Sequence, residues 1–172
     1  MTDGNEQVSI FQWFLILVFG LLLVVAVAAI VFVILVPAEG EHYTDFYILG
    51  KDGIAADYPE RIHIGEPETI IVGVHNHEYR DITYLMEIYL LNQTTENNEV
   101  IINSMEPLDR FRVSLEHDQH EELVYTFIVD KTGYNRLEFL LFDENAPPDQ
   151  VMGKDRINAN YRDLYLSIQI EE

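Results

Sequence analysis

An unbroken apolar run dominates the start of the chain. Residues 11–36 (FQWFLILVFGLLLVVAVAAIVFVILV) contain no charged side chain, and from Phe14 onward apolar residues would cover every face of a helix. At about 1.5 Å per residue that helix is roughly 39 Å long, enough to cross a hydrocarbon layer of about 30 Å. A buried core helix usually keeps a polar stripe. The sequence therefore predicts a transmembrane helix at residues 9–37, after a short tail at residues 1–8.

The flanks of this run argue against a cleaved secretory signal. Residues 1–9 (MTDGNEQVS) contain no basic residue, and the run is longer than the stretch of about 7–15 apolar residues found in such signals. Trp13 lies near one end, where an indole suits the membrane interface, and Pro37 ends the helix because it lacks an amide donor. We expect an uncleaved anchor.

The pattern changes to alternating apolar and polar positions after residue 42. Alternation with period two is typical of strands. Two segments, 69–76 and 83–92, each place their apolar residues on a single face, which predicts one buried side. Segment 123–129 is apolar on both faces in places, which predicts a central strand, and HDQH separates it from segment 110–116 in the manner of a hairpin. About seven strands are expected in all: 43–49, 69–76, 83–92, 110–116, 123–129, 135–142 and 161–170.

Turn residues fall between these segments and set the fold class. Gly, Pro, Asp and Asn cluster at 50–53, 65–67, 131–133 and 144–155, and no window after residue 40 keeps a helical period with caps. Seven short strands in about 130 residues predict an all-β, immunoglobulin-like antiparallel sandwich at residues 43–172. A linker at residues 38–42 would hold it close to the membrane.

The charge balance excludes one class of partner. The chain has 30 Asp and Glu residues against ten Lys and Arg, a formal charge of −20, and nearly all of this charge follows the apolar run. Such an excess opposes binding to nucleic acid and to anionic lipid surfaces. The negative charge is consistent with two interpretations: a well-solvated surface, or a surface that attracts cations and basic partners.

Topology depends on weaker signals. Few charges flank the apolar run, so the positive-inside rule has almost nothing to act on. Asn92 begins an N-x-[ST] sequon, which makes it a glycosylation candidate and favours an exterior domain. The absence of cysteine fits either side of the membrane. A short tail, an anchor and a large C-terminal domain are typical of an exported domain, so we expect residues 43–172 to be extracytoplasmic.

Two groups of residues are candidate metal ligands. His75 and His77 are two apart on a predicted strand and would share a face, although the sequence identifies no third ligand; the competing interpretation is a strand end entering a turn, where Asn76 and His77 bond to backbone. Asp143 and Asp149 lie in a segment with several oxygen donors of the kind that Ca²⁺ uses. That segment does not match the EF-hand pattern, and acidic residues are abundant throughout.

No catalytic motif is complete. The segments HEYRD and HEELV begin like H-E-x-x-H but lack the second histidine, and His117 and His120 flank Asp118 in a predicted solvated turn. G-x-S-x-G, the P-loop and G-x-G-x-x-G are absent. We therefore expect no catalytic residues and no cofactor.

The second part of the chain resembles a known family. Its most specific segments are FYILG (46–50), GEPETIIVGV (65–74) and NHEY (76–79). Over most of residues 43–170 the chain is similar to the extracytoplasmic domain of a mainly archaeal membrane family, domain of unknown function 1616. The resemblance implies an archaeal cell-surface protein and supports the exterior topology, but it brings no activity and no functional residues. Many relatives carry several membrane helices, whereas this chain has one.

The expected function is a membrane-anchored structural or interaction module of the cell envelope. Its partners would be the lipid bilayer, through residues 9–37, and proteins or glycans at the cell surface, but not nucleic acid. Small residues in the helix, among them Gly20 and Ala26, would allow a homo-oligomer. The alternatives are a pilin-like filament subunit, cut after Gly4, and a metal-binding ectodomain.

Overall fold

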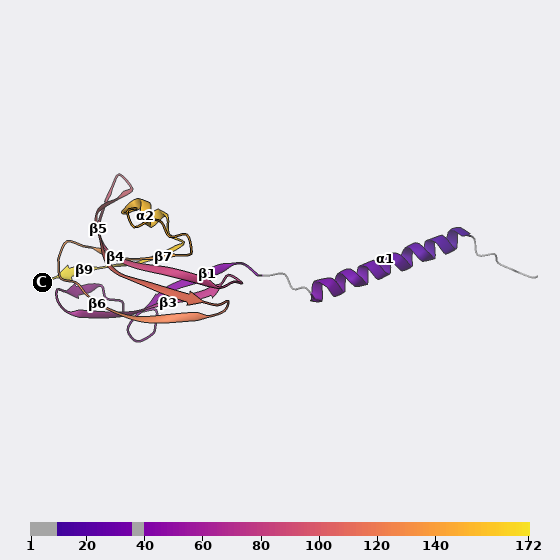
Figure 1. The fold of residues 1–172 in the computed structure, drawn as a ribbon, viewed down its shortest axis with the longest axis horizontal. Coiled ribbons are helices and arrows are strands. Elements are labelled where there is room, and N and C mark those ends of the chain that lie inside the picture. The colour runs from indigo at the N-terminus through magenta and orange to yellow at the C-terminus, as the bar shows by residue number, and fades with distance from the viewer. Residues whose placement is uncertain (1–9, 36–39) are drawn as a thin grey trace, which may run out of the picture. The chain divides into compact units, whose positions relative to one another are not determined.

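The structure, a computed structural model, describes residues 10–35 and 40–172, and Figure 1 shows it as a ribbon. The chain divides into two compact units, Met1–Gly40 and Glu41–Glu172. In the first, α1 (Ile10–Leu35) is a continuous helix, and its segment Phe11–Leu35 is long and apolar enough to cross a membrane. The predicted tail at residues 1–8 lies outside the described residues, and so do residues 36–39 at the predicted end of the span and start of the linker.

The second unit is an immunoglobulin-like antiparallel sandwich, as predicted. Its two main sheets stack as layers (Figure 1) and have the strand orders β1-β3-β6 and β5-β4-β7-β8. The first sheet contains β1 (Tyr43–Leu49), β3 (Pro67–His77) and β6 (His120–Ile128). The second contains β4 (Ile82–Glu96), β5 (Glu99–Leu115), β7 (Arg136–Phe142) and β8 (Arg162–Ser167). Two short elements were not predicted: the strand β2 (Arg61–His63) and the helix α2 (Lys154–Asn158). The predicted strand 161–170 is divided into β8 and β9 (Gln169–Glu171), and β9 pairs in parallel with β2.

The main core lies between the two sheets. Alternate residues of β3 and β4 point inward, as the period-two pattern predicted, and meet the inward residues of β6 and β7. Each fully buried aliphatic or aromatic side chain contributes about 1.5–3 kcal/mol relative to exposure. The fully buried members include Ile70, Val72, Tyr84, Ile88, Leu137 and Phe139.

A second, smaller core covers the other face of β4 and β7. Leu85, Tyr89 and Leu91 of β4 are buried there together with Leu140 and Phe142 of β7. Ala146 and Ile157, from the segment that contains α2, pack over them. The prediction that segment 83–92 has one buried side was therefore wrong, because a segment far along the chain covers the second side.

The hairpin predicted from segments 110–116 and 123–129 was also wrong. β5 pairs with β4, whereas β6 pairs with β3, so the HDQH segment passes from one sheet to the other. The true hairpin is β4–β5, which turns at Asn97 and Asn98, both with positive φ; two such residues form the type I′ turn that suits strand twist. β6 is an edge strand of its sheet and not the central strand that its apolar residues predicted; Val124 on its outer face is 65% exposed.

Replacing Gly50 by alanine is expected to lower the free energy of unfolding of residues 41–172 by about 1–3 kcal/mol. Gly50 is buried after β1, and a Cβ there would lie 2.1 Å from the backbone oxygen of Ala56. The loop would have to shift to admit it. Urea titration measures the change, and Asp52→Ala, at an exposed position of the same loop, should stay within about 0.5 kcal/mol.

Candidate functional site

The outer face of the β1-β3-β6 sheet collects polar and aromatic side chains in register. Asp45 of β1 pairs with His75 of β3, which pairs in turn with His120 of β6. Residues directly opposite one another on neighbouring strands project to the same face. His77 lies two residues beyond His75 and therefore shares that face, as the sequence predicted. β1 supplies the acidic residue that the sequence did not identify.

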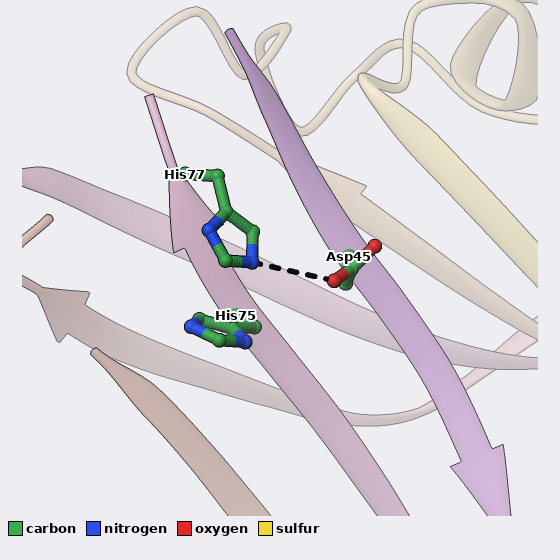
Figure 2. Close-up of side chains that lie close together, drawn as sticks. All are labelled: Asp45, His75 and His77. Carbon is green, nitrogen blue, oxygen red and sulfur yellow. Dashed lines mark ion pairs between the residues drawn. The ribbon is translucent and has the colours of Figure 1, made fainter. Parts of the chain in front are cut away.

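Asp45, His75 and His77 form a compact group, which we call the His–Asp cluster (Figure 2). Their ligand atoms all lie within 4.8 Å of one another, and no other group of three His, Cys, Asp or Glu residues does so in residues 10–35 and 40–172. The imidazole rings of His75 and His77 are adjacent, with centroids 3.8 Å apart. The ring of His120 lies 5.5 Å from that of His75.

His77 lies between two carboxylates. Its Nε2 is 3.4 Å from Oδ2 of Asp45, the contact drawn in Figure 2. Its Nδ1 is 3.0 Å from Oδ1 of Asp118. Asp118 belongs to the HDQH segment and has a φ of 62°, a left-handed conformation that Asp tolerates better than most residues. The segment that crosses between the sheets thus places the carboxylate of Asp118 next to Nδ1 of His77.

His75 differs from His77 in its hydrogen bonding. Its Nε2 is buried and has no hydrogen-bond partner among the described residues. A buried polar atom left without a partner costs about 1–3 kcal/mol, so the position of this nitrogen calls for a physical reason.

Two tyrosines border the cluster on the same face. Tyr43 stacks on His77 with ring centroids 4.6 Å apart. Tyr47 passes over Gly73, where a side chain would clash with its ring, and donates a 2.9 Å hydrogen bond to Glu122 of β6. Burial and this hydrogen bond raise the pKa of Tyr47 above its ordinary value of 10.0. Two aromatic rings on this face therefore lie near the cluster.

The predicted calcium ligands are not brought together. Asp143 accepts hydrogen bonds from the backbone and side chain of Asn145 in a turn. Asp149 pairs instead with Arg110 at 2.7 Å, and that hydrogen bond lowers the pKa of Asp149. Both carboxylates have partners within the protein, and neither belongs to a compact group of three possible metal ligands among the described residues.

Asn92 and His117 also lie in defined surroundings. The side-chain nitrogen of Asn92, the atom that a glycan would modify, donates to the carbonyl of Gly133, and its oxygen accepts a 2.7 Å hydrogen bond from Asn103. His117 stacks on Tyr79 with centroids 4.3 Å apart. Glycosylation at Asn92 stays a prediction, and a sugar there would replace the contact with Gly133.

The buried charges beside the second core were not predicted from the sequence. Glu87 and Arg156 are each 1% exposed and form a bidentate pair, with N–O distances of 2.6 and 2.7 Å. Glu138, fully buried, pairs with Arg136, but its Oε1 has no partner among the described residues. Burial raises the pKa of Glu138 above its ordinary value despite Arg136. Glu87 also lines an open cavity together with Tyr89, Arg110 and Asp149.

Comparisons with known proteins give one family and several similar folds. Residues 37–169 match the model of a family described as Domain of unknown function (DUF1616), and no curated protein matches the chain significantly. The CARDB domain of the PF1109 protein from Pyrococcus furiosus, in complex with di-metal ions, has a TM-score of 0.44 and 15% identity, covering 76% of this chain and 89% of that one. A β-glucosidase from Listeria innocua has a TM-score of 0.44 and 10% identity, with 76% and 16% covered. The sporulation control protein Spo0M from Bacillus subtilis has a TM-score of 0.42 and 11% identity, with 77% and 50% covered.

Proposed function

Because the chain belongs to the DUF1616 family, whose description assigns no activity, we propose a function from its architecture. The protein is a membrane-anchored module of the cell envelope. Its helix holds a β-sandwich outside the membrane, and the sandwich makes structural or binding contacts with protein or glycan partners there. Catalysis is not part of this role.

The observation that carries the proposal is the helix α1. Phe11–Leu35 contains no charged residue and is long enough to span a bilayer. Among the described residues of its own unit no other element covers its apolar side chains, among them Leu17, Leu23 and Val33. In water those side chains would remain exposed at a cost of about 25 cal/mol per Å², so a lipid environment is the favourable one.

The sandwich supports a contact role rather than a chemical one. β6 is an edge strand that exposes Val124 and Ile128, and the tip of the β4–β5 hairpin exposes Val100 and Ile101. Edge strands and loop tips are where such folds meet partners. An anchor also raises the effective concentration of the domain for neighbours in the same membrane. The net negative charge selects basic or neutral partners.

In cells that express the full chain, the protein is expected to remain with the membrane after carbonate extraction. A C-terminal epitope should be digested by protease added to intact cells. The triple variant Leu22→Arg, Val25→Arg, Ala28→Arg should move most of the protein out of the membrane fraction, because each Arg at the centre of a span costs about 2.5–3.5 kcal/mol.

A matched control keeps the same positions apolar. Leu22→Ile, Val25→Ile, Ala28→Leu should fractionate as the unchanged protein does. Recovery of the unchanged chain in the soluble fraction without detergent would contradict anchoring. Protection of the epitope while known surface proteins are digested would contradict the exterior placement, and intact-mass analysis that finds a chain beginning at Asn5 would favour a processed filament subunit instead. Cross-linking in intact cells, read by mass spectrometry, then identifies the neighbours.

A further inference from the structure

We propose that the His–Asp cluster binds one Zn²⁺ ion, with His75, His77 and Asp45 as its three protein ligands. The site lies on the outer face of the β1-β3-β6 sheet and involves residues 41–172 only. It therefore goes beyond the anchoring role and does not depend on it.

The spacing of the ligand atoms fits one ion. Zn²⁺ binds imidazole nitrogen and carboxylate oxygen at about 2.0–2.2 Å, so two ligands of a tetrahedral ion are about 3.3–3.5 Å apart. Nε2 of His77 and Oδ2 of Asp45 are 3.4 Å apart. The whole group spans up to 4.8 Å, so it needs a small inward movement to bind. The side chain of Asp45 is 53% exposed and is free to make it.

A second carboxylate, that of Asp118, orients His77 for metal binding. A zinc-bound histidine usually donates its other ring N–H to a carboxylate or carbonyl, which fixes its tautomer and orientation. Asp118 lies 3.0 Å from Nδ1 of His77 and provides that acceptor. With the proton held on Nδ1, Nε2 presents its lone pair toward Asp45 and a shared ion.

The Nε2 of His75, which has no hydrogen-bond partner among the described residues, is an independent indication of a metal site. An imidazolium held between Asp45 and Asp118 would explain the position of His77 without any metal, but it gives no role to His75. Nε2 of His75 is buried beside the ring of His77 and lacks a hydrogen bond among the described residues. Binding of an ion through this Nε2 would give it a partner, so one ion would account for both rings together.

The ligand set selects the ion. Two imidazoles with one carboxylate suit Zn²⁺, and other late divalent ions such as Co²⁺ can replace it. Ca²⁺ and Mg²⁺ prefer sites made of oxygen atoms alone. Three protein ligands leave the fourth position of a tetrahedral ion for water or for a donor from a partner, which is the pattern of an open rather than a closed zinc site.

The test uses the full chain, in detergent and without a histidine tag, after removal of metal by a chelator. Titration with Zn²⁺ in a calorimeter should show one saturable site, and Co²⁺ should give the visible absorption bands of a tetrahedral complex. His77→Ala and His75→Ala should each weaken binding more than 100-fold. Asp118→Asn, which keeps a residue suited to the left-handed turn, should weaken it about 10- to 100-fold.

His63→Ala is the matched control, because His63 is an exposed histidine on β2 outside the cluster; it should bind Zn²⁺ as the unchanged protein does. Circular dichroism of each variant checks that it is folded. Absence of saturable binding by the unchanged chain would overturn the proposal, and so would folded His75→Ala and His77→Ala variants that retain its affinity.

Discussion

Replacing Arg156 by alanine is expected to lower the free energy of unfolding of residues 41–172 by about 3–5 kcal/mol. The guanidinium of Arg156 binds both oxygens of Glu87 and also donates to the carbonyls of Pro148 and Val151, at 3.0 and 3.1 Å. It thus fastens the segment that contains α2 over the second core. Its removal leaves a buried carboxylate short of its main partner and takes a donor from the carbonyl of Val151, whereas the carbonyl of Pro148 keeps the backbone N–H of Val151.

Urea titration at several pH values separates the ion pair from simple loss of packing. Burial alone would raise the pKa of Glu87, but hydrogen bonds from Arg156 and Tyr89 and the charges of Arg156 and Arg110 lower it below its ordinary value of 4.5. A carboxyl with a lowered pKa stabilises the fold above its unfolded pKa and loses that contribution as the pH falls through its folded pKa. The difference between Arg156→Ala and the unchanged protein should therefore shrink below a pH of about 4.5.

Two further variants test whether loss of the ion pair between Glu87 and Arg156 causes the destabilisation. Arg112→Ala removes an exposed arginine from β5 and should change the free energy of unfolding by no more than about 0.5 kcal/mol. The double replacement Glu87→Leu, Arg156→Met removes both charges and should recover most of the loss, because apolar residues of similar volume often replace a buried pair without cost. A loss from Arg156→Ala that is equally large at pH 7 and at low pH would argue against the ion pair.

The buried residues of a strand could be predicted where the alternation of inward and outward side chains alone determined them. In β3, inward residues alternate with outward ones, so Ile70, Val72 and Val74 could be assigned to the core from the sequence. The same rule failed for β4, because burial of its second face depends on the segment that contains α2, and α2 (Lys154–Asn158) begins 58 positions after β4 ends at Glu96. Burial by a distant segment leaves no local pattern.

The strand partners were less predictable than the strands. The β4–β5 hairpin has shifts of register between Ile88 and Tyr89 and between Asn92 and Gln93, and each shift interrupts the alternation on which the strand ends were judged. The pair Asn97-Asn98 is a recognisable signal for a type I′ turn and could have located the hairpin. No comparable signal showed that β6 joins the other sheet.

Two of the three residues of the His–Asp cluster could be derived from the sequence. His75 and His77 share a face because strands repeat every two residues, whereas Asp45 joins them only because β1 pairs with β3 in one register. Asn76 lies between the two histidines. The interpretation that its side chain bonds to backbone atoms at the end of a strand also agrees with the structure.

Replacing Asn76 by alanine is expected to lower the free energy of unfolding by about 3 kcal/mol or more, since each buried polar group left without a partner costs about 1–3 kcal/mol. Asn76 is fully buried. Its side-chain nitrogen is directed at the carbonyls of Arg80, Leu115 and Glu116, at 2.8–3.1 Å, and its oxygen accepts from the backbone of Glu78 at 2.9 Å. One amide group thus joins the end of β3 to both the turn that follows it and the crossing between the sheets.

Asn76→Asp provides the sharper comparison, because it has nearly the same shape. It keeps the acceptor for Glu78 but turns a second oxygen toward the carbonyls, where no donor remains, so its cost at pH 7 should be at least that of alanine. Thr83→Ala, which removes an exposed hydrogen bond to Ser114, should cost less than about 1 kcal/mol. If Asn76→Asp were as stable as the unchanged protein in urea titrations of residues 41–172, the amide would not be the group that holds these two turns together.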